Sequence, residues 1–230
     1  MSQLLLELMP EQEPTFDNFV AGDNGELVSR LRGLSDRGSF DAVYLWGLTG
    51  CGKSHLLAAT IGAAASKRPT VLLPANEIGS EIITTPGALL AIDDVEALSE
   101  TAQIALFRVF NAARIAGLAL LLTGREPPSR LKLREDLRTR IGQSLIYEVK
   151  ALSDEEKAAA LKRHAMTRGM RIDEGLVRYL LSRGRRDLPA LMAVLDALDR
   201  ATLEQKRPAT LPLLKDVMQL QLDYDEPDSV

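Results

Sequence analysis

The chain has 230 residues, of which 46% are hydrophobic, 26% charged and 4% aromatic. This length and composition suit a globular protein with a sizeable core and exclude a fibrous or largely disordered chain. The 28 Lys and Arg residues are outnumbered by 32 Asp and Glu residues, which gives a formal net charge of −4. Autonomous binders of duplex DNA usually carry an excess of positive charge, so we expect no direct sequence-specific DNA binding.

The sequence also bears on the cellular compartment. We find no apolar segment long enough to cross a membrane, and residues 1–7 lack the basic region and the cleavage site of a signal peptide. Cys51 is the single cysteine, which rules out an intrachain disulfide and favours a reducing environment. We therefore expect a cytoplasmic protein that does not associate with membranes.

The first 150 residues have the pattern of a parallel α/β domain. An N-terminal tail ends near Pro14, and the first apolar run is closed by Gly47 and followed by a predicted helix from Lys53 to about Ser66. The next three apolar runs have the length of strands that are covered on both faces, and residues 101–116 are predicted to form a crossover helix. The five expected strands are residues 42–46, 70–73, 88–92, 118–122 and 145–149.

The pattern changes near residue 151, where strand-like runs give way to helical periodicity. Ser153 and Glu156 form a capping-box pattern, and Asp173 and Asp187 are suited to cap two later helices. The four expected helices are residues 154–168, 174–183, 188–206 and 211–220. The predicted fold is an α/β parallel sheet sandwiched by helices, followed by a small all-α domain.

Residues 47–54, G-L-T-G-C-G-K-S, satisfy the phosphate-binding pattern G-x-x-x-x-G-K-[ST] between a strand and a helix. In this pattern glycines allow backbone N–H groups to surround a phosphate, Lys53 reaches the outer phosphates and Ser54 binds Mg²⁺. An ordinary glycine turn is the alternative, and the flanking strand and helix weigh against it. The expected nucleotide-binding residues of this loop are Gly47, Thr49, Gly50, Cys51, Gly52, Lys53 and Ser54.

Asp93 and Asp94 follow an apolar strand, at the carboxyl end where phosphates bind in open α/β sheets. Asp93 is expected to hold Mg²⁺, and Asp94 to orient or deprotonate the attacking water. An acidic pair after an apolar run is more often a helix cap or a loop. Its order and distance after the phosphate-binding loop favour the functional interpretation.

Three arginines are candidates for stabilising the charge of a transferred phosphoryl group. Arg138 and Arg140 precede the last expected strand, and Arg186 lies near the start of the third C-terminal helix. From the residues alone, a solvated surface arginine is the better explanation of each.

The sequence resembles the DnaA-type AAA+ proteins over nearly its whole length. The resemblance rests on T-F-D-N-F-V-A-G-D-N at residues 15–24, on His55-Leu56-Leu57, on Phe110-Asn111 and on Thr123-Gly124 followed by Pro127-Pro128. It implies an AAA+ nucleotide-binding fold that holds ADP or ATP with Mg²⁺.

The resemblance also assigns roles to single residues. It implies that Phe19, Val20 and His55 help to enclose the nucleotide. Arg140 falls on the position of an arginine finger that acts in trans, and Arg186 falls on the sensor 2 position.

Within this family the sequence is most similar to the short Hda group. It ends in an acidic segment at residues 224–228, where DnaA continues into a helix-turn-helix domain. The N-terminal run Q-L-L-L-E-L resembles the motif by which Hda proteins dock on the DNA polymerase III sliding clamp, with Gln3, Leu4, Leu6 and Leu8 as contacts. By motif alone, an amphipathic strand that pairs within the protein is an equally good explanation, and the terminal position favours docking.

These observations predict four parts of the chain. They are a clamp-binding tail at residues 1–14, an AAA+ α/β domain at 15–150, a helical lid at 151–222 and an acidic disordered tail at 223–230. Nucleotide is expected between the α/β domain and the lid.

Arg125-Glu126 departs from the family pattern, because the sensor 1 region usually has an Asp after Thr-Gly. An arginine there can bind phosphate instead of positioning water, and Asp94 is shorter than the glutamate common in faster AAA+ ATPases. We therefore expect slow hydrolysis at best.

The implied function is regulatory inactivation of DnaA. The clamp-bound protein would present Arg140 to ATP held by DnaA, complete a composite site and drive DnaA to its ADP form. A nucleotide-regulated adaptor or helicase loader is one alternative, and a P-loop kinase of small molecules is another. The sequence leaves open the preferred nucleotide, the identity of the partner and the oligomeric state, for which a homodimer is one option.

Overall fold

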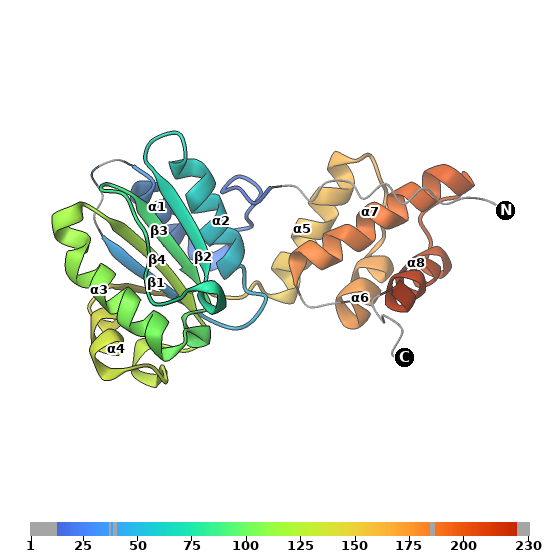
Figure 1. Ribbon diagram of the computed structural model, residues 1–230. Helices are drawn as coiled ribbons and strands as arrows, with labels where there is room; N and C mark the ends of the chain where they lie inside the picture. The colour runs from blue at the N-terminus through green and yellow to red at the C-terminus, as the bar shows by residue number, and fades with distance from the viewer. Residues whose placement is uncertain (1–12, 37, 39–40, 185–186, 225–230) are drawn as a thin grey trace. The chain divides into compact units, whose positions relative to one another are not determined.

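The computed structural model describes residues 13–36, 38, 41–184 and 187–224 (Figure 1). The chain divides into two compact units, residues 1–150 and 151–230, and each is described by itself.

The first unit is built on one sheet of five parallel strands in the order β2-β3-β4-β1-β5. The strands are β1 (Ala42–Trp46), β2 (Thr70–Pro74), β3 (Leu89–Asp93), β4 (Ala119–Gly124) and β5 (Leu145–Glu148). Trp46 pairs with Gly124, and Ile92 pairs with Leu122, so the carboxyl ends of β1, β3 and β4 lie at one edge of the sheet. The predicted parallel sheet is confirmed.

Helices cover both faces of this sheet (Figure 1). Successive strand residues point to opposite faces, so Tyr44 packs in a core with α3 and α4, whereas Val43 and Leu45 pack in a core with α1 and α2. The helices are α1 (Gly25–Leu34), α2 (Lys53–Ala64), α3 (Glu100–Ala116) and α4 (Glu135–Gly142). Short 3₁₀ helices are η1 (Gly22–Asn24), η2 (Ala75–Glu77), η3 (Val95–Ala97) and η4 (Pro128–Arg130).

Two of these helices, α1 and α4, are not predicted by the sequence pattern. The helix α4 has 8 residues, and its buried apolar side chains are Leu137 and Ile141, one turn apart. The helix α1 begins at Gly25 and contains Gly33, and glycine has low helix propensity. Both helices therefore depend on packing against the sheet, which short-range sequence patterns do not encode.

The two outer strands are less buried than their apolar sequences suggest. Leu72 of β2 is 43% exposed, and Leu145 and Ile146 of β5 are 37% and 41% exposed. The sequence predicts that the strands at residues 70–73, 88–92 and 118–122 are covered on both faces. This prediction is wrong for β2 and correct for β3 and β4. The difference follows from the position of β2 at the edge of the sheet.

The second unit consists of the helices α5 (Asp154–Thr167), α6 (Glu174–Arg183), α7 (Leu188–Gln205) and α8 (Leu211–Tyr224). They enclose a separate apolar core, which includes Leu161 and Leu214. The predicted capping box is present: the Ser153 N–H donates to Glu156 Oε2 at 2.8 Å, and the Glu156 N–H donates to Ser153 Oγ at 3.1 Å. The helix α8 extends two residues beyond residue 222, the expected end of the lid.

The side chain of Arg68 is buried, with 4% exposure, and donates hydrogen bonds to several loops of the first unit. Its Nε donates to Gly87 O at 2.8 Å, and its Nη2 donates to Ala88 O at 3.1 Å and to Gly117 O at 3.3 Å. Its Nη1 donates to Asp36 O at 3.2 Å. These carbonyl groups follow α1 and α3 and precede β3 and β4, so one side chain fastens the amino edge of the sheet.

Replacing Arg68 with methionine should lower the free energy of unfolding by about 3 kcal/mol or more, because several buried carbonyl groups lose a donor. Denaturant unfolding measures this change. Lys67→Met is the matched control, since Lys67 pairs with Asp36 at 2.6 Å through side chains that are 46% and 61% exposed. Such a surface pair contributes about 1 kcal/mol or less. Equal losses of stability in the two variants would contradict the role of Arg68.

Candidate nucleotide-binding site

The loop between β1 and α2 depends on three glycines with positive φ. The φ angles of Gly47, Gly50 and Gly52 are 151°, 80° and 101°. Residues with a Cβ rarely adopt this region, and glycine reaches it without a steric penalty. A loop of this kind can turn successive N–H groups toward one anion.

Close packing also requires two of these glycines. A Cβ on Gly47 would lie 2.7 Å from Val149 O, and a Cβ on Gly52 would lie 2.8 Å from Cε2 of Phe19. The Phe19 ring therefore rests directly against the phosphate-binding loop. The same loop includes Cys51, which is partly buried, and Thr49, which is exposed.

Lys53 is the first residue of α2, and its ammonium group folds back over the loop. Its Nζ donates to Gly47 O at 2.8 Å and to Leu48 O at 2.9 Å. The amino end of a helix favours negative charge, and α2 has 12 residues. The ammonium group of Lys53, the amino end of α2 and the N–H groups of the loop thus all favour a negative charge at the same place, which fits a phosphate group.

Ser54 and Asp93 lie together, as a magnesium site of this type requires. Ser54 Oγ donates to Asp93 Oδ2 at 2.7 Å, and Thr123 Oγ1 donates to Asp93 Oδ1. Oxygen ligands are those that Mg²⁺ prefers, and phosphate oxygens and water complete its shell in nucleotide sites. The arrangement therefore fits Mg²⁺ bound jointly with a nucleotide.

Asp94 is restrained by its neighbours. Its φ is 59°, its N–H donates to Thr123 Oγ1 at 2.9 Å, and its Oδ2 accepts from Arg125 Nη2 at 3.0 Å. Arg125, which the sequence suggests as a phosphate ligand, is thus placed on the carboxylate that would orient water. The side chains of Arg125 and Asp94 are 65% and 42% exposed.

The segment before α1 packs beside the phosphate-binding loop. The rings of Phe19 and His55 lie 5.4 Å apart between centroids, and His55 Nε2 lies 2.9 Å from Thr15 O. Val20 is half-buried. Phe19, Val20 and His55, which the family resemblance assigns to nucleotide binding, thus belong to this segment and to the adjoining helix α2.

A buried asparagine, which the sequence alone does not single out, fastens this segment. Asn24 is 4% exposed; its Nδ2 donates to Lys150 O at 2.9 Å, and its Oδ1 accepts from the Lys150 N–H at 2.8 Å. The two residues are 126 positions apart, so no local pattern could have revealed the pair.

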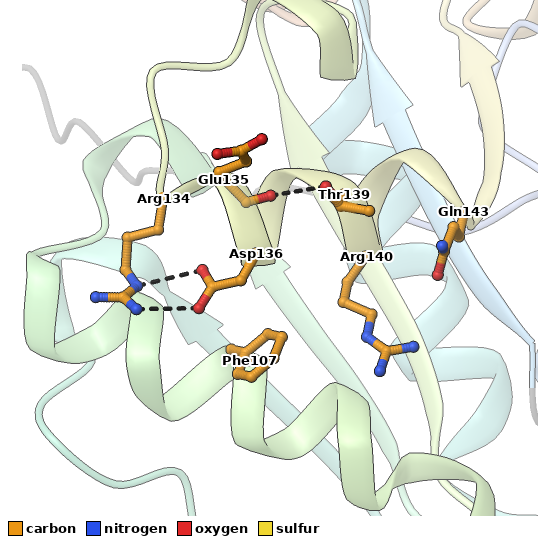
Figure 2. A pocket seen from close by; sticks show the side chains of 7 residues that line it. All are labelled: Phe107, Arg134, Glu135, Asp136, Thr139, Arg140 and Gln143. Atoms are coloured by element: carbon orange, nitrogen blue, oxygen red, sulfur yellow. Dashed lines mark hydrogen bonds and ion pairs between the residues drawn. The ribbon is translucent and has the colours of Figure 1, made fainter.

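Arg140 belongs to a second cluster, on α3 and α4. Its Nη2 donates to Asn111 Oδ1 at 2.8 Å, and its side chain is exposed. Figure 2 shows Arg140 beside an open hollow. The other lining residues are Phe107, Arg134, Glu135, Asp136, Thr139 and Gln143.

The rim of this hollow is ordered by local bonds (Figure 2). Arg134 donates to both oxygens of Asp136, at 3.2 and 3.0 Å, and Thr139 Oγ1 donates to Glu135 O at 2.8 Å. The hydrogen bonds and charge of Arg134 hold the pKa of Asp136 below its ordinary value. The positive charge of Arg134 is thus paired with the carboxylate of Asp136, whereas Arg140 donates a hydrogen bond to an uncharged amide.

Five residues with predicted roles lie outside the described part of the chain. They are the proposed sensor 2 arginine, Arg186, and the proposed clamp contacts Gln3, Leu4, Leu6 and Leu8.

The second unit matches a known family model, and the whole fold resembles solved structures. Residues 154–218 match the model described as "Hda, lid domain". Domain III of the replication initiation protein DnaA from Thermotoga maritima has a TM-score of 0.71 at 17% sequence identity, over 94% of this chain and 98% of that one.

Two further structures show the same similarity. Replication initiator DnaA bound to AMPPCP and single-stranded DNA has a TM-score of 0.66 at 20% identity, over 85% of this chain and 68% of that one. A variant of RuvB from Thermotoga maritima has a TM-score of 0.70 at 19% identity, over 90% and 72% of the two chains.

The protein therefore has the AAA+ fold, and a loop with the phosphate-binding sequence pattern lies at the carboxyl edge of its sheet. Within that fold, residues 154–218 are similar to the lid domain of Hda, and the first unit together with the lid shares the fold of DnaA. Among the described residues, no helix is long and apolar enough to span a membrane.

Replacing Lys53 with alanine should abolish tight binding of ADP and ATP, because residues 47–54 contain no other cation. Isothermal titration calorimetry measures the affinity. Lys132→Ala is the control, since Lys132 is an exposed lysine outside the loop and its loss should leave the affinity unchanged. Wild-type affinity in Lys53→Ala would show that the nucleotide site lies elsewhere.

Proposed function

We propose that this protein binds an adenine nucleotide with Mg²⁺ at its phosphate-binding loop and promotes the hydrolysis of ATP held by DnaA. Arg140 supplies the arginine finger in trans. The protein acts while docked on the DNA polymerase III sliding clamp through residues 3–8. DnaA is thereby converted to its ADP form, which suppresses replication initiation.

This proposal rests on the exposure and the hydrogen bonding of Arg140. Its guanidinium is exposed and donates a hydrogen bond to a neutral partner, the Oδ1 of Asn111, next to an open hollow. An arginine finger needs both features, because it must be pre-oriented and must keep its charge available for a phosphate outside its own protein. Arg134 in the same hollow lacks the second feature, since it is bonded to Asp136.

The protein's own nucleotide site supports a regulatory role. Lys53, Ser54 and Asp93 are arranged for binding phosphate and Mg²⁺, whereas Asp94 is paired with Arg125. A site that binds well and hydrolyses slowly is suited to a structural or regulatory nucleotide. The composite site with DnaA would then be the place of catalysis.

An adaptor that recruits partners without promoting hydrolysis is the second candidate. The Asp94–Arg125 pair favours it to the same degree, because slow hydrolysis in the protein's own site suits both functions. The two functions differ in whether Arg140 is required for activity.

Replacing Arg140 with alanine should preserve the fold, the nucleotide affinity and clamp binding, and should abolish the stimulation of ATP hydrolysis by DnaA. Arginine fingers accelerate related reactions by roughly 10³ to 10⁵, so the loss should be plain. Phosphate release from DnaA preloaded with ATP, in the presence of clamp and DNA, measures the effect.

The matched control is Arg138→Ala, two residues away on the same helix, where the side chain projects in another direction. This variant should stimulate DnaA at the wild-type rate. If Arg140→Ala also stimulates DnaA at that rate, the finger mechanism is wrong and the adaptor is the better explanation.

Replacing Gln3, Leu4 and Leu6 together with alanine should abolish clamp binding and leave the melting temperature unchanged. Apolar side chains on a tethered peptide contribute to a partner's groove rather than to the core. Surface plasmon resonance with immobilised clamp and a thermal melt measure the two properties. A melting temperature several degrees lower would instead make the segment part of the fold.

A further inference from the structure

The residues after β4 are fastened to the acidic segment after β3. Glu96, in η3, accepts hydrogen bonds at its Oε1 from the N–H groups of Arg125 at 2.6 Å and Glu126 at 3.3 Å. Asp94 lies two positions before Glu96 in the chain. The carboxylate of Glu96 thus sets where the Arg125 backbone lies relative to Asp94.

A buried tyrosine fixes the same loop from the side of β1. Tyr44 is 0% exposed, and its hydroxyl donates to Glu126 O at 2.7 Å. Burial, together with the charges of Glu96, Glu126 and Asp94, raises the pKa of Tyr44 above its ordinary value. The hydroxyl therefore stays protonated and remains a donor. Arg125 and Glu126 are thus held through both their N–H groups and the carbonyl of Glu126.

Gly124 allows these groups to approach each other. A Cβ at this position would lie 2.9 Å from Glu96 Oε1, 3.0 Å from Glu96 Oε2 and closer still to the Tyr44 hydroxyl. Any larger residue would push Glu96 or Tyr44 away from the loop.

The second oxygen of Glu96 is a destabilising feature of this arrangement. Glu96 Oε2 is buried and has no hydrogen-bond partner within the described part of the chain. A buried acceptor without a donor costs free energy, and such groups call for a functional explanation. The hydrogen bonds that Glu96 Oε1 accepts provide such an explanation, because they position the loop that contains Arg125.

The side chain of Arg125 completes the arrangement, because its Nη2 donates to Asp94 Oδ2 at 3.0 Å. Asp94 is already fixed at its backbone by Thr123, at 2.9 Å. The guanidinium of Arg125 thus occupies a carboxylate oxygen that would otherwise accept a hydrogen bond from the attacking water.

From this geometry we propose that Glu96 is a positioning residue that fixes Arg125 on Asp94, and that the Arg125–Asp94 pair restrains ATP hydrolysis in the protein's own site. In the restrained step, water that is oriented by Asp94 attacks the γ-phosphorus, the bond to the bridging oxygen breaks, ADP leaves, and the protons of the water stay on the released phosphate. This inference rests on the proposed binding of ATP at the phosphate-binding loop, and it is independent of any action on DnaA.

Single-turnover hydrolysis of bound ATP, without DnaA, tests the inference. Arg125→Gln should hydrolyse ATP faster than the wild type, by up to about fivefold, which is the coupling expected of an exposed ion pair. Glu96→Ala should show the same increase. Glu96→Gln retains an acceptor oxygen for the two N–H groups and should stay near the wild-type rate.

A double variant shows whether a faster rate in Arg125→Gln comes from freeing the Asp94 carboxylate or from a general loss of order in the loop. Adding Asp94→Asn to Arg125→Gln should remove the increase, because the carboxylate that orients the water is lost. Glu126→Gln is the matched control: its side chain contacts Arg130 at 3.7 Å, its backbone groups are kept, and its rate should be unchanged.

Two results would overturn the inference. If Arg125→Gln is as slow as the wild type or slower, Arg125 does not restrain hydrolysis. If the increase persists in the double variant, Asp94 is not the group that the pair restrains. A wild-type protein that binds no ATP in calorimetry would instead refute the proposed nucleotide site itself, and failure to stimulate DnaA would refute only the action in trans.

Discussion

The hydrogen bonds that Asp93 accepts connect the parts of the candidate nucleotide site. Its two oxygens accept from the hydroxyls of Ser54, at 2.7 Å, and of Thr123, so one carboxylate connects α2, β3 and β4. This contact is available because parallel strands end at the same edge of the sheet, where the phosphate-binding loop also begins. The glycines of the loop, the lysine of α2 and the acidic end of β3 depend on that edge for their common position.

The same α/β unit carries two groups of polar and charged residues, to which we assign different tasks. Lys53, Ser54 and Asp93 converge on the loop after β1, whereas Arg140 lies on α4 and is oriented by Asn111 of α3. We expect the first group to bind the protein's own nucleotide and the second to act on the nucleotide of a partner. The proposed restraint of Asp94 by Arg125 fits this division, because the protein's own nucleotide would then last longer than the one held by the partner.

The sequence could predict those parts of the site that lie in one contiguous stretch. Residues 47–54 and Asp93-Asp94 are recognisable because a phosphate-binding loop and an acidic strand end each need particular residues at fixed spacing. The parallel sheet was predictable for a related reason, since apolar runs of strand length alternate with a helical pattern.

The remaining contacts join residues that are far apart in the chain. Glu96 and Arg125 are 29 positions apart, as are Asn111 and Arg140, and no local pattern specifies such pairs. Arg68 is similar, because its partners are backbone carbonyls, which every residue type provides. The short helix α4 also escapes prediction, since packing of two side chains rather than helix propensity stabilises it.

The proposed function requires Arg140 of this protein to reach ATP that is held by another molecule. A cryo-EM structure of the protein with DnaA, a non-hydrolysable ATP analogue, sliding clamp and DNA measures this directly. We expect the Arg140 guanidinium to lie about 3 Å from a γ-phosphate oxygen of the nucleotide in DnaA. A complex in which α4 faces solvent, with other residues contacting that phosphate, would contradict the claim.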